Sequence, residues 1–396
     1  MERLHRNVCE GVVNCLNDIF FGGKYADKAI ERTLKSNPKW GSRDRKFIAE
    51  TVYESVRWYR LLQYIANCEP NDFWKISGAW LLSNGTTLPP WKEWSSLDAS
   101  SLKSRYEEAK KTRKIIHSIP DWLDELASNE LGENWENVLL QLNEPAEVIL
   151  RVNTLKTNLQ SLKKTLLLKN IATENISFAS DALVLSKRQN IFSLPEFQNG
   201  LFEVQDGGSQ LIAPFLRAEP GMRVIDACAG AGGKSLHLAA LLQNKGKIIA
   251  MDVEEWKLNE LQKRAKRAGI NTIETRLIDS LKAIKRLENS ADRLLLDVPC
   301  SGLGVLKRNP DAKWKLKPEN IEQVKNTQKE ILETYSLMLK SGGLMVYATC
   351  SILPSENTEQ VKYFLSKNPL FEWVDEKIVL PTTQNDGFYM ALLQKK

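Results

Sequence analysis

Long apolar runs, paired cysteines and clustered histidines are all missing from this sequence. No apolar stretch is long enough to span a bilayer, which excludes an ordinary transmembrane helix. The opening residues, Met1 to Arg6, lack the apolar segment of a secretory signal. Six cysteines include no C-x-x-C pair and only three histidines are present, so no zinc-ligand spacing exists. We therefore expect a cytoplasmic protein with free thiols, without a metal and without a membrane partner.

A strong charge of one sign is missing as well. Lys and Arg number 55 against 49 Asp and Glu, which leaves a formal net charge of +6. This mild excess leans toward a polyanionic partner, but composition alone leaves nucleic-acid binding an open question. At 396 residues the chain is too long for one ordinary domain, so two or three domains are expected.

Local patterns divide the chain into three predicted parts. Residues 1–114 are predicted to be helical, with Ser42 as a candidate cap for a helix whose apolar residues continue to Leu62. Five tryptophans between Trp58 and Trp94 favour core packing over base stacking. Residues 115–205 are predicted to form a small mixed α/β unit, with strands at 148–152, 183–186 and 201–204 and a helix at 159–168.

Residues 206–396 alternate strands with helices, which predicts a Rossmann-like α/β fold around a parallel sheet. Strands are expected at 223–228, 247–252, 272–279, 292–298 and 343–349, and the clearest helix at 254–268. In the order 3-2-1-4-5 the fourth and fifth of these strands are neighbours. A last strand at 387–395 is expected to run antiparallel to one near 372–374.

The first strand of this part ends in a turn of small residues that leads into a helix. Small residues let the backbone approach a ligand closely, and the helix N-terminus adds N–H donors. A P-loop needs glycine where Cys228 stands, and the NAD fingerprint needs glycine where Ser235 stands, so both readings are weakened without being eliminated. The predicted cofactor loop comprises Asp226, Cys228, Ala229, Gly230, Ala231, Gly232, Gly233 and Lys234.

Acidic residues end the next two strands. Asp252 is expected to hold ribose hydroxyls, and Asp279 is expected to reach an adenine amino group. A single carboxylate at a strand end is often only a cap or a turn residue. Together with Asp226, three acids around one sheet edge favour S-adenosylmethionine as the cofactor.

Two cysteines follow the fourth and fifth strands, in Leu296-Asp-Val-Pro-Cys-Ser-Gly302 and Tyr347-Ala-Thr-Cys-Ser351. The strand order therefore predicts that Cys300 and Cys350 lie side by side at the cofactor edge. Such thiols have a chemical use, because a thiolate that adds to carbon 6 of cytosine makes carbon 5 nucleophilic enough to accept a methyl group.

Asp297 would then hydrogen-bond the base, and Lys234 would depress the thiol pKa or orient the base. The spacing leaves open which cysteine is the nucleophile, because DNA cytosine methyltransferases use a Pro-Cys pair like the one that contains Cys300.

Six segments in order resemble a known family, the RNA 5-methylcytosine methyltransferases of the RsmB/NSUN (Sun/Nop) group. They are Arg151-Val-Asn-Thr-Leu-Lys156, Val204-Gln-Asp-Gly-Gly-Ser-Gln-Leu211, the Cys228–Lys234 loop, Asp297-Val-Pro-Cys-Ser-Gly302, Arg308-Asn-Pro-Asp-Ala-Lys-Trp314 and Thr349-Cys-Ser-Ile-Leu-Pro-Ser-Glu-Asn357. The segment Asp44–Arg57 is similar to the NusB-like RNA-binding domain of the bacterial ribosomal RNA members, and residues 115–205 look like the family's small RRM-like extension. Family members usually carry proline where Ala231 stands, a departure that leaves the loop small.

The resemblance implies an S-adenosylmethionine-dependent enzyme that methylates carbon 5 of a cytosine in RNA, with 16S ribosomal RNA as the expected substrate. The protein is expected to be a monomer. It implies that Cys350 is the nucleophile and that Cys300 helps to release the product. It also implies that the loop at 228–234, Asp252, Asp279 and Asp297 line the pocket for cofactor and base. The alternative is a non-catalytic RNA-binding factor with a relic fold, which would have no chemical need for two thiols beside Asp297.

Basic residues form two clusters in the third part of the chain. Those on the helix at 254–268 are expected to be a solvated face, and those in the loop after Cys300 are expected to contact RNA. The helix cluster comprises Lys257, Lys263, Arg264, Lys266 and Arg267, and the loop cluster comprises Lys307, Arg308, Lys313, Lys315 and Lys317.

Overall fold

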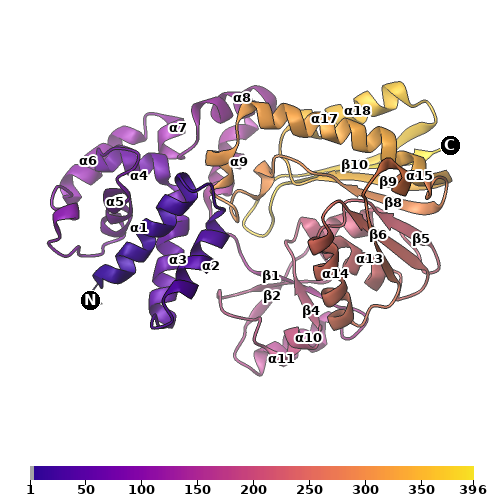
Figure 1. Cartoon of the computed structure of the whole chain (residues 1–396), viewed down its shortest axis with the longest axis horizontal. Helices are drawn as coiled ribbons and strands as arrows, with labels where there is room; N and C mark the ends of the chain where they lie inside the picture. Colours follow the sequence, from indigo (N-terminus) through magenta and orange to yellow (C-terminus); the bar gives the residue numbers. More distant parts are fainter. Residues whose placement is uncertain (1–3) are drawn as a thin grey trace. The chain divides into compact units, whose positions relative to one another are not determined.

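The computed structural model describes residues 4–396, which form two compact units. One unit is helical and consists of the chain up to Asn143 together with Leu306–Pro318. The other contains both sheets and consists of Glu144–Val305 with Glu319–Lys396. Figure 1 colours the chain by sequence, which shows the orange segment around residue 310 among the indigo and purple helices.

The helical unit is built around amphipathic helices whose apolar faces share one core. That core includes Val12 and Leu16 of α1 and Ile48, Val52 and Val56 of α3. The helix α3 begins at Ser42, so Gly41 rather than Ser42 occupies the cap position, and Asp44 Oδ2 accepts the Gly41 N–H at 3.0 Å. The helices of this unit are α1 (Arg6–Phe20), α2 (Ala26–Ser36), α3 (Ser42–Arg57), α4 (Tyr59–Ala66), α5 (Phe73–Ser83), η1 (Lys92–Trp94), α6 (Ala99–Ala109), α7 (Arg113–Ile116), α8 (Asp121–Leu131), α9 (Asn134–Asn143) and α16 (Ala312–Lys315).

Tryptophans in this unit pack on one another, as core packing requires. Trp74 meets Trp94 edge-on with ring centroids 5.6 Å apart, and Trp91 stacks on Trp94 at 4.8 Å. The Trp94 indole N–H donates to the Trp74 carbonyl at 2.7 Å and the side chain is buried. For these three residues the prediction of core packing is confirmed.

The helical unit extends beyond the boundary at residue 114 that the sequence predicts. Arg113 forms a two-point ion pair with Asp124 of α8, and the Trp135 indole of α9 donates to the same carboxylate at 2.8 Å. Asn143 Nδ2 donates to the His117 carbonyl at 2.9 Å. These polar contacts join α8 and α9 to the helical unit. They link residues 11 to 26 positions apart, which a pattern of neighbouring residues does not reveal.

The segment Leu306–Pro318 follows Cys300 in the sequence but belongs to the helical unit. Its Lys313 ammonium donates to the Arg57 carbonyl at 2.8 Å, and its Trp314 indole donates to the Val56 carbonyl at 2.7 Å. Lys307 and Lys313 are buried. The prediction that this loop offers these two lysines to RNA is therefore wrong, because a buried ammonium has no surface to present to a phosphate.

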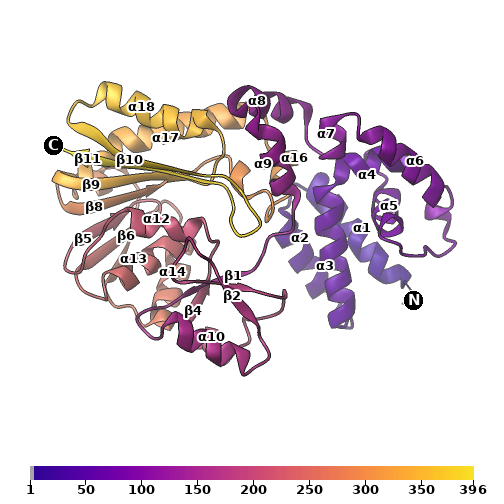
Figure 2. The same ribbon diagram turned by 180° about the vertical axis from the view of Figure 1, so that it is seen from behind.

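The smaller sheet of the second unit is a four-stranded antiparallel sheet in the order β2-β3-β1-β4. Its core packs Leu150, Val152 and Phe202 against Leu162 and Leu166 of α10. Figure 2 shows α10 on the face of this sheet that lies away from the larger sheet. The elements are β1 (Ile149–Val152), α10 (Leu159–Leu167), β2 (Thr173–Asn175), β3 (Ala182–Leu185), α11 (Pro195–Gln198) and β4 (Phe202–Val204). Of these the sequence missed β2, a strand of three residues, and α11, a helix of four.

The larger sheet has seven strands in the order β10-β11-β9-β8-β5-β6-β7. Five neighbouring strands, β9, β8, β5, β6 and β7, are parallel to one another. The strand β11 pairs antiparallel with both β9 and β10. The predicted order 3-2-1-4-5 and the antiparallel final strand are both confirmed. The strands are β5 (Arg223–Asp226), β6 (Lys247–Asp252), β7 (Ile273–Leu277), β8 (Ala291–Asp297), β9 (Leu339–Thr349), β10 (Phe371–Val379) and β11 (Phe388–Lys395).

Helices cover both faces of this sheet because successive residues of each buried strand point to opposite sides. Ile225 packs on the face covered by α15, α17 and α18, whereas its neighbour Val224 packs on the face covered by α12, α13 and α14. These helices are α12 (Ile212–Phe215), α13 (Gly233–Leu241), α14 (Glu255–Ala268), α15 (Leu281–Lys285), α17 (Pro318–Tyr335) and α18 (Thr358–Lys367), with short turns η2 (Ser209–Leu211), η3 (Leu303–Val305), η4 (Ser336–Met338) and η5 (Pro354–Glu356). The result is the Rossmann-like three-layer fold that the sequence predicts.

Candidate active site

The carboxyl ends of the parallel strands meet at one edge of the large sheet. There β5 ends at Asp226, β6 at Asp252, β8 at Asp297 and β9 at Thr349. In such a sheet the crevice beyond these ends is where ligands bind. Asp297 is paired with Ala348 in the register of β8 and β9, which brings the loops after these two strands together.

The loop after β5 is shaped by two glycines with positive φ. Gly232 has φ of +87° and caps α13, and a Cβ added there would lie 2.4 Å from Leu261 Cγ of α14. Gly230 has φ of +52°, and a Cβ there would meet no atom within 4 Å. Gly232 therefore serves close packing against α14, whereas Gly230 borders open space in which a ligand can approach the backbone.

The Asp252 carboxylate joins this loop to the next strand end. Its Oδ2 accepts the Gly230 N–H at 2.9 Å and its Oδ1 accepts the Glu254 N–H at 2.9 Å. Each carboxylate oxygen has a second lone pair, so Asp252 keeps capacity to accept hydrogen bonds from hydroxyl groups. Asp279, two residues beyond the end of β7, is exposed at the same edge, and its Oδ1 accepts the Ser280 hydroxyl.

Asp226, which the sequence places in the cofactor loop, lies beneath that loop with no exposed surface. Its Oδ2 accepts the Ser235 hydroxyl at 2.6 Å, which ties β5 to the first turn of α13. Burial raises the pKa of this carboxyl to about 7, and the Ser235 hydrogen bond opposes that shift. The side chain supports the loop from below instead of lining its open side.

Lys234 and Asp297 form an ion pair in which Nζ lies 2.5 Å from Oδ2. Burial alone would lower the pKa of Lys234, but the Asp297 carboxylate overcomes this effect and the pKa is raised, so the ammonium stays charged. Cys350 also attracts this ammonium electrostatically. The pair therefore places one cation beside the thiols and one carboxylate at the end of β8.

Cys300 and Cys350 lie side by side, with their Sγ atoms 3.2 Å apart. The predicted juxtaposition of the two thiols is thus confirmed. The hydrogen bond with Cys350 and then burial raise the pKa of Cys300 well above its usual range. Cys300 therefore keeps its proton at neutral pH.

Two arginines hold the cofactor loop from outside, and spacing alone did not identify them as supports. Arg151 of β1, buried, donates to the Gly233 carbonyl at 2.6 Å, and Arg264 of α14 donates to the Ala231 carbonyl at 2.7 Å. Glu203 of β4 binds both Arg264 and Arg267. The prediction that the basic residues of this helix form a solvated face is therefore wrong for Arg264 and Arg267. Through Arg151 the small sheet also contacts the loop directly.

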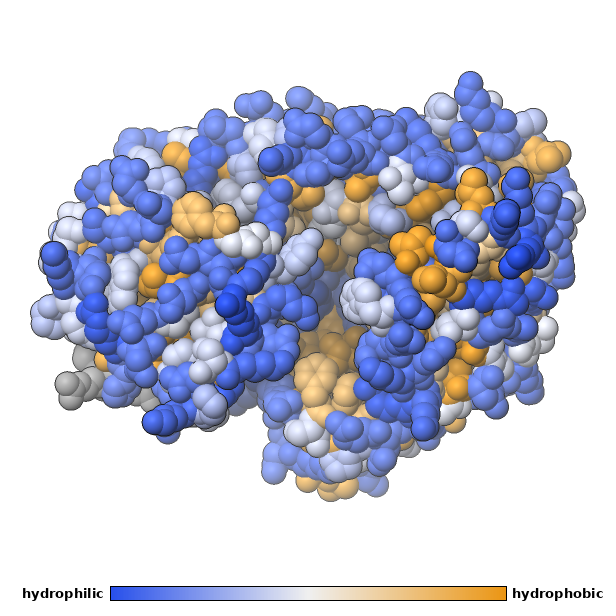
Figure 3. Space-filling model, viewed as in Figure 1, coloured by the Kyte–Doolittle hydropathy of each residue, from blue (hydrophilic) through white to orange (hydrophobic). Residues whose placement is uncertain are grey.

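Apolar side chains are exposed beside the two acids at the edge of β6 and β7. They are Val253, Trp256, Leu277 and Leu281. Figure 3 shows orange patches in the blue surface over the part of the visible face that carries α14 and α15 in Figure 1. A flat apolar ring held by Asp252 and Asp279 would find hydrophobic neighbours here.

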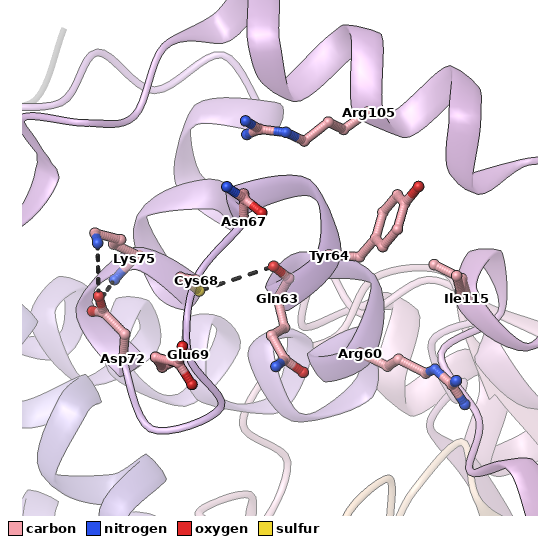
Figure 4. Close-up of a pocket in the computed structure, with 10 residues that line it drawn as sticks. All are labelled: Arg60, Gln63, Tyr64, Asn67, Cys68, Glu69, Asp72, Lys75, Arg105 and Ile115. Atoms are coloured by element: carbon pink, nitrogen blue, oxygen red, sulfur yellow. Dashed lines mark hydrogen bonds and ion pairs between the residues drawn. The ribbon is translucent and has the colours of Figure 1, made fainter.

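A second hollow lies in the helical unit, with a cavity volume of about 780 Å³ (Figure 4). In its lining Lys75 pairs with Asp72 at 3.1 Å, and Arg105 donates to the Ile65 carbonyl. Burial raises the pKa of Cys68 in this hollow to about 11, so this thiol is a poor nucleophile at neutral pH. None of the predicted site residues lines this cavity. The lining residues are Arg60, Gln63, Tyr64, Asn67, Cys68, Glu69, Asp72, Lys75, Arg105 and Ile115.

Within residues 4–396 no group of three or more His, Cys, Asp or Glu side chains could hold a metal ion. Over the same residues, no helix has the length and apolar character needed to cross a membrane.

Comparison with known proteins relates the chain to ribosomal RNA methyltransferases. The profile of the family described as 16S rRNA methyltransferase RsmB/F matches residues 213–394, and that of the RsmF/B-like ferredoxin-like domain matches residues 119–192. The latter begins before α8, so sequence assigns α8 and α9 to the small domain although they pack in the helical unit. The NusB likeness of the N-terminal helices stays a prediction.

A probable ribosomal RNA small subunit methyltransferase B of Synechocystis is 31% identical over 96% of this chain and 97% of its own. The corresponding enzyme of Vibrio vulnificus is 34% identical over 72% of this chain and 67% of its own. A methyltransferase homolog from Pyrococcus horikoshii has a solved structure with a TM-score of 0.64 and 27% identity, covering 72% of this chain and 98% of that one. The solved structure of PH0851, 24% identical, has the same fold over 100% of both chains with a TM-score of 0.82. On the identity and coverage of these relatives, this chain belongs to the RsmB/F family of S-adenosylmethionine-dependent methyltransferases.

Proposed function

We propose that this protein transfers a methyl group from S-adenosylmethionine to carbon 5 of a cytosine in small-subunit ribosomal RNA, through a covalent bond between the base and Cys350. The observation that carries this proposal is the pair of thiols 3.2 Å apart beside the Lys234–Asp297 ion pair. Methylation of oxygen or nitrogen needs no thiol, whereas methylation at carbon 5 of cytosine needs one to activate the ring.

The division of labour between the cysteines is taken from the family resemblance, which implies that Cys350 is the nucleophile. The pKa of Cys300 is raised by its contact with Cys350 and by burial, which suits a proton donor better than an attacking thiolate. Cys350 then attacks carbon 6 of the cytosine. After methyl transfer, a base must remove the proton from carbon 5 so that the Cys350–carbon bond can break. Cys300, whose Sγ lies 3.2 Å from that of Cys350, can take up this proton once it has passed its own proton to solvent.

Asp297 binds the target base in this proposal. Its carboxyl group lies at the end of β8 and is partly exposed, and Oδ2 contacts Lys234. Its carboxylate can accept a hydrogen bond from the exocyclic amino group and, once the ring nitrogen has taken up a proton during thiol addition, one from that N–H as well. This arrangement stabilises the charge that develops on the ring during thiol addition.

The cofactor site fits S-adenosylmethionine, which supplies an electrophilic methyl group when bound. The open space over Gly230 admits the amino acid part, and Asp252 has lone pairs left for ribose hydroxyls. Asp279 is exposed for an adenine amino group, beside the apolar side chains Val253 and Trp256. Asp226 contributes by supporting the loop from below.

The substrate class follows from the relatives. Those with more than 30% identity over most of the chain are named as methyltransferases of ribosomal RNA of the small subunit. We therefore assign 16S ribosomal RNA as the substrate and S-adenosylmethionine as the donor.

The two cysteine variants test the proposal through opposite outcomes. In Cys350→Ala, incubation with labelled S-adenosylmethionine and 16S ribosomal RNA should yield neither methylated RNA nor a covalent protein–RNA complex. In Cys300→Ala, addition proceeds but release stalls, so a covalent complex stable in denaturing gels should accumulate. Bisulfite mapping of the RNA then locates the cytosine.

The unchanged protein is the control and should release methylated RNA without a lasting complex. If the complex accumulates in Cys350→Ala instead, Cys300 is the nucleophile. If the unchanged protein labels no cytosine in any RNA, the proposal of carbon-5 methylation fails, and the fold serves RNA binding alone.

A further inference from the structure

Glu356 lies where the two cysteine-bearing loops meet, and its side chain has no exposed surface. Its Oε1 accepts the hydroxyl of Ser301 and the hydroxyl of Ser351, each at 2.5 Å. Ser301 directly follows Cys300, and Ser351 directly follows Cys350. One carboxylate oxygen therefore binds the residue next to each thiol.

The second oxygen of Glu356 secures the Cys300 loop further. Oε2 accepts the backbone N–H of Ser301 at 2.8 Å and the Nε2 of Gln328 at 3.1 Å. Gln328, buried on α17, also donates to the Pro299 carbonyl at 3.0 Å. The residues on both sides of Cys300 are thus bound to one buried network.

The Cys350 loop is held on both sides in the same way by the neighbouring Asn357. Its Nδ2 donates to the Ser351 carbonyl at 3.0 Å, and its Oδ1 accepts the Thr349 hydroxyl at 2.5 Å. The Glu356 carbonyl also accepts the Tyr347 hydroxyl at 2.7 Å. The turn η5 that carries Glu356 and Asn357 consequently fixes both cysteine loops.

The chemistry of the site explains why a carboxylate stands at this point. Four hydrogen atoms from the two loops and α17 point at the side chain of residue 356, and an ionised carboxylate is the side chain that only accepts. Glutamine would direct its own NH₂ group at two of these donors, and an apolar residue would leave four buried donors unsatisfied. Hydrogen bonds to a buried charge are also stronger than neutral ones.

We propose that Glu356 is a positioning residue that sets the separation of the Cys300 and Cys350 thiols by binding Ser301 and Ser351 together. Its effect on methyl transfer rests on the proposed function above. A proton passes between the thiols only while they are in hydrogen-bond contact, and a displacement of about 1 Å in such a contact costs about 100-fold in rate.

Disulfide formation measures the thiol separation in the protein without RNA or cofactor. A diazene oxidant such as diamide takes one hydrogen from each thiol, joins the two sulfurs and is reduced to the hydrazine. Peptide mass mapping then follows the Cys300–Cys350 bond over time. Glu356→Gln should slow formation of this bond by about tenfold or more, because the effective concentration of one thiol near the other falls.

Glu359→Gln is the matched control, since the same change is made three residues later at an exposed position. It should form the bond as fast as the unchanged protein. Ser301→Ala and Ser351→Ala each remove one hydroxyl donor and should give intermediate rates, which keeps the test decisive if Glu356→Gln fails to fold. Equal bond-forming rates in the unchanged protein and in these variants would overturn the proposal.

Single-turnover methyl transfer supplies the second readout. Glu356→Gln should lose about 100-fold in the rate of transfer while its affinities for RNA and S-adenosylmethionine stay within about twofold of the unchanged protein. A loss confined to affinity would overturn the positioning role. If the unchanged protein transfers no methyl group to cytosine, the proposed function fails, while the disulfide rates still decide the role of Glu356.

Discussion

Among the acidic residues at the strand ends, Asp226 alone has no exposed surface; Asp252 is 7% exposed. Asp252, Asp279 and Asp297 keep oxygen atoms with capacity to bind a ligand, whereas Asp226 is enclosed and holds Ser235. The sequence pattern treats Asp226, Asp252 and Asp279 alike because each follows a predicted strand. Only the depth of β5 beneath the cofactor loop distinguishes Asp226, and depth depends on the packing of α13 over it.

The buried carboxyl of Asp226 predicts a pH dependence of folding stability. Its pKa is raised from 3.8 to about 7, so between these values the folded state holds a proton that the unfolded chain has released. The stability contributed by this group is therefore fully present below about pH 4 and is lost as pH rises to about 7, by roughly 4 kcal/mol. Asp226→Asn should remove this decline, as measured by urea unfolding at pH 5 and pH 8.

Asp279→Asn is the control for this measurement, because it makes the same change at an exposed strand end. Its unfolding free energy should depend on pH as that of the unchanged protein does. An Asp226→Asn variant that still loses the full stability between the two pH values would show that another group causes the decline.

At the scale of elements, the turn between β5 and α13 depends on its contact with α14. Leu261 fills the space beside Gly232, so a side chain at this position would clash with it. Glycine is also favoured here because φ is positive. Arg264, one turn further along the same helix, binds the Ala231 carbonyl. The helix α14 thus shapes the cofactor loop, although it lies outside the loop in sequence.

Substitution of the two loop glycines should separate packing from backbone strain. Gly232→Ala adds a clash with Leu261 to the cost of positive φ and should lower the free energy of unfolding by about 3 kcal/mol or more. Gly230→Ala meets open space and should cost only about 1 kcal/mol through its φ. Denaturant unfolding compares the stabilities, and calorimetry compares the affinities for S-adenosylmethionine.

We expect the affinity to fall in both variants, since Gly230 borders the ligand space and Gly232 shapes the loop. The stability difference is what decides the packing argument. Equal losses of stability in the two variants would mean that the Gly232–Leu261 contact relaxes without cost.

At the scale of the whole molecule, the chain does not divide into consecutive domains. Leu306–Pro318 leaves the sheet-bearing part of the sequence and contributes to the helical unit. There Asp311 Oδ2 accepts the Ala26 N–H at 3.1 Å, and Lys313 donates to Arg57 and Asn143. A domain cut out at residue 114 or 143 would lack these partners.

Lys313→Ala tests whether this lysine is structural. The variant loses two buried hydrogen bonds and the packing of its aliphatic stem, so the free energy of unfolding should fall by roughly 3 kcal/mol. Lys317→Ala, at an exposed position of the same segment, should change it by less than about 0.5 kcal/mol. Thermal unfolding checks both, and RNA titrations at several salt concentrations check binding. Unchanged stability with a shallower salt dependence of RNA binding would return Lys313 to the role of a phosphate contact.

The sequence by itself determined the Rossmann-like fold, the strand order, the glycine-containing turn between the first strand and its helix, and the neighbouring thiols. These follow from strong local patterns and from the single handedness of parallel crossovers, which together leave few arrangements for five strands. With the strand order known, residues at strand ends are placed without any knowledge of side-chain contacts. Cys300 and Cys350 could therefore be predicted as neighbours from the strand ends alone.

Only the tertiary structure decided which polar side chains are buried and what they bind. Arg151 supports the cofactor loop, Lys313 is enclosed by helices, and Glu356 binds both cysteine loops. Each depends on partners far away in the sequence, such as Arg57 for Lys313, and no local periodicity carries that information. A charged residue looks the same in a sequence whether water or a buried partner satisfies it, and burial decides between the two because an unpaired charge in the core is too costly.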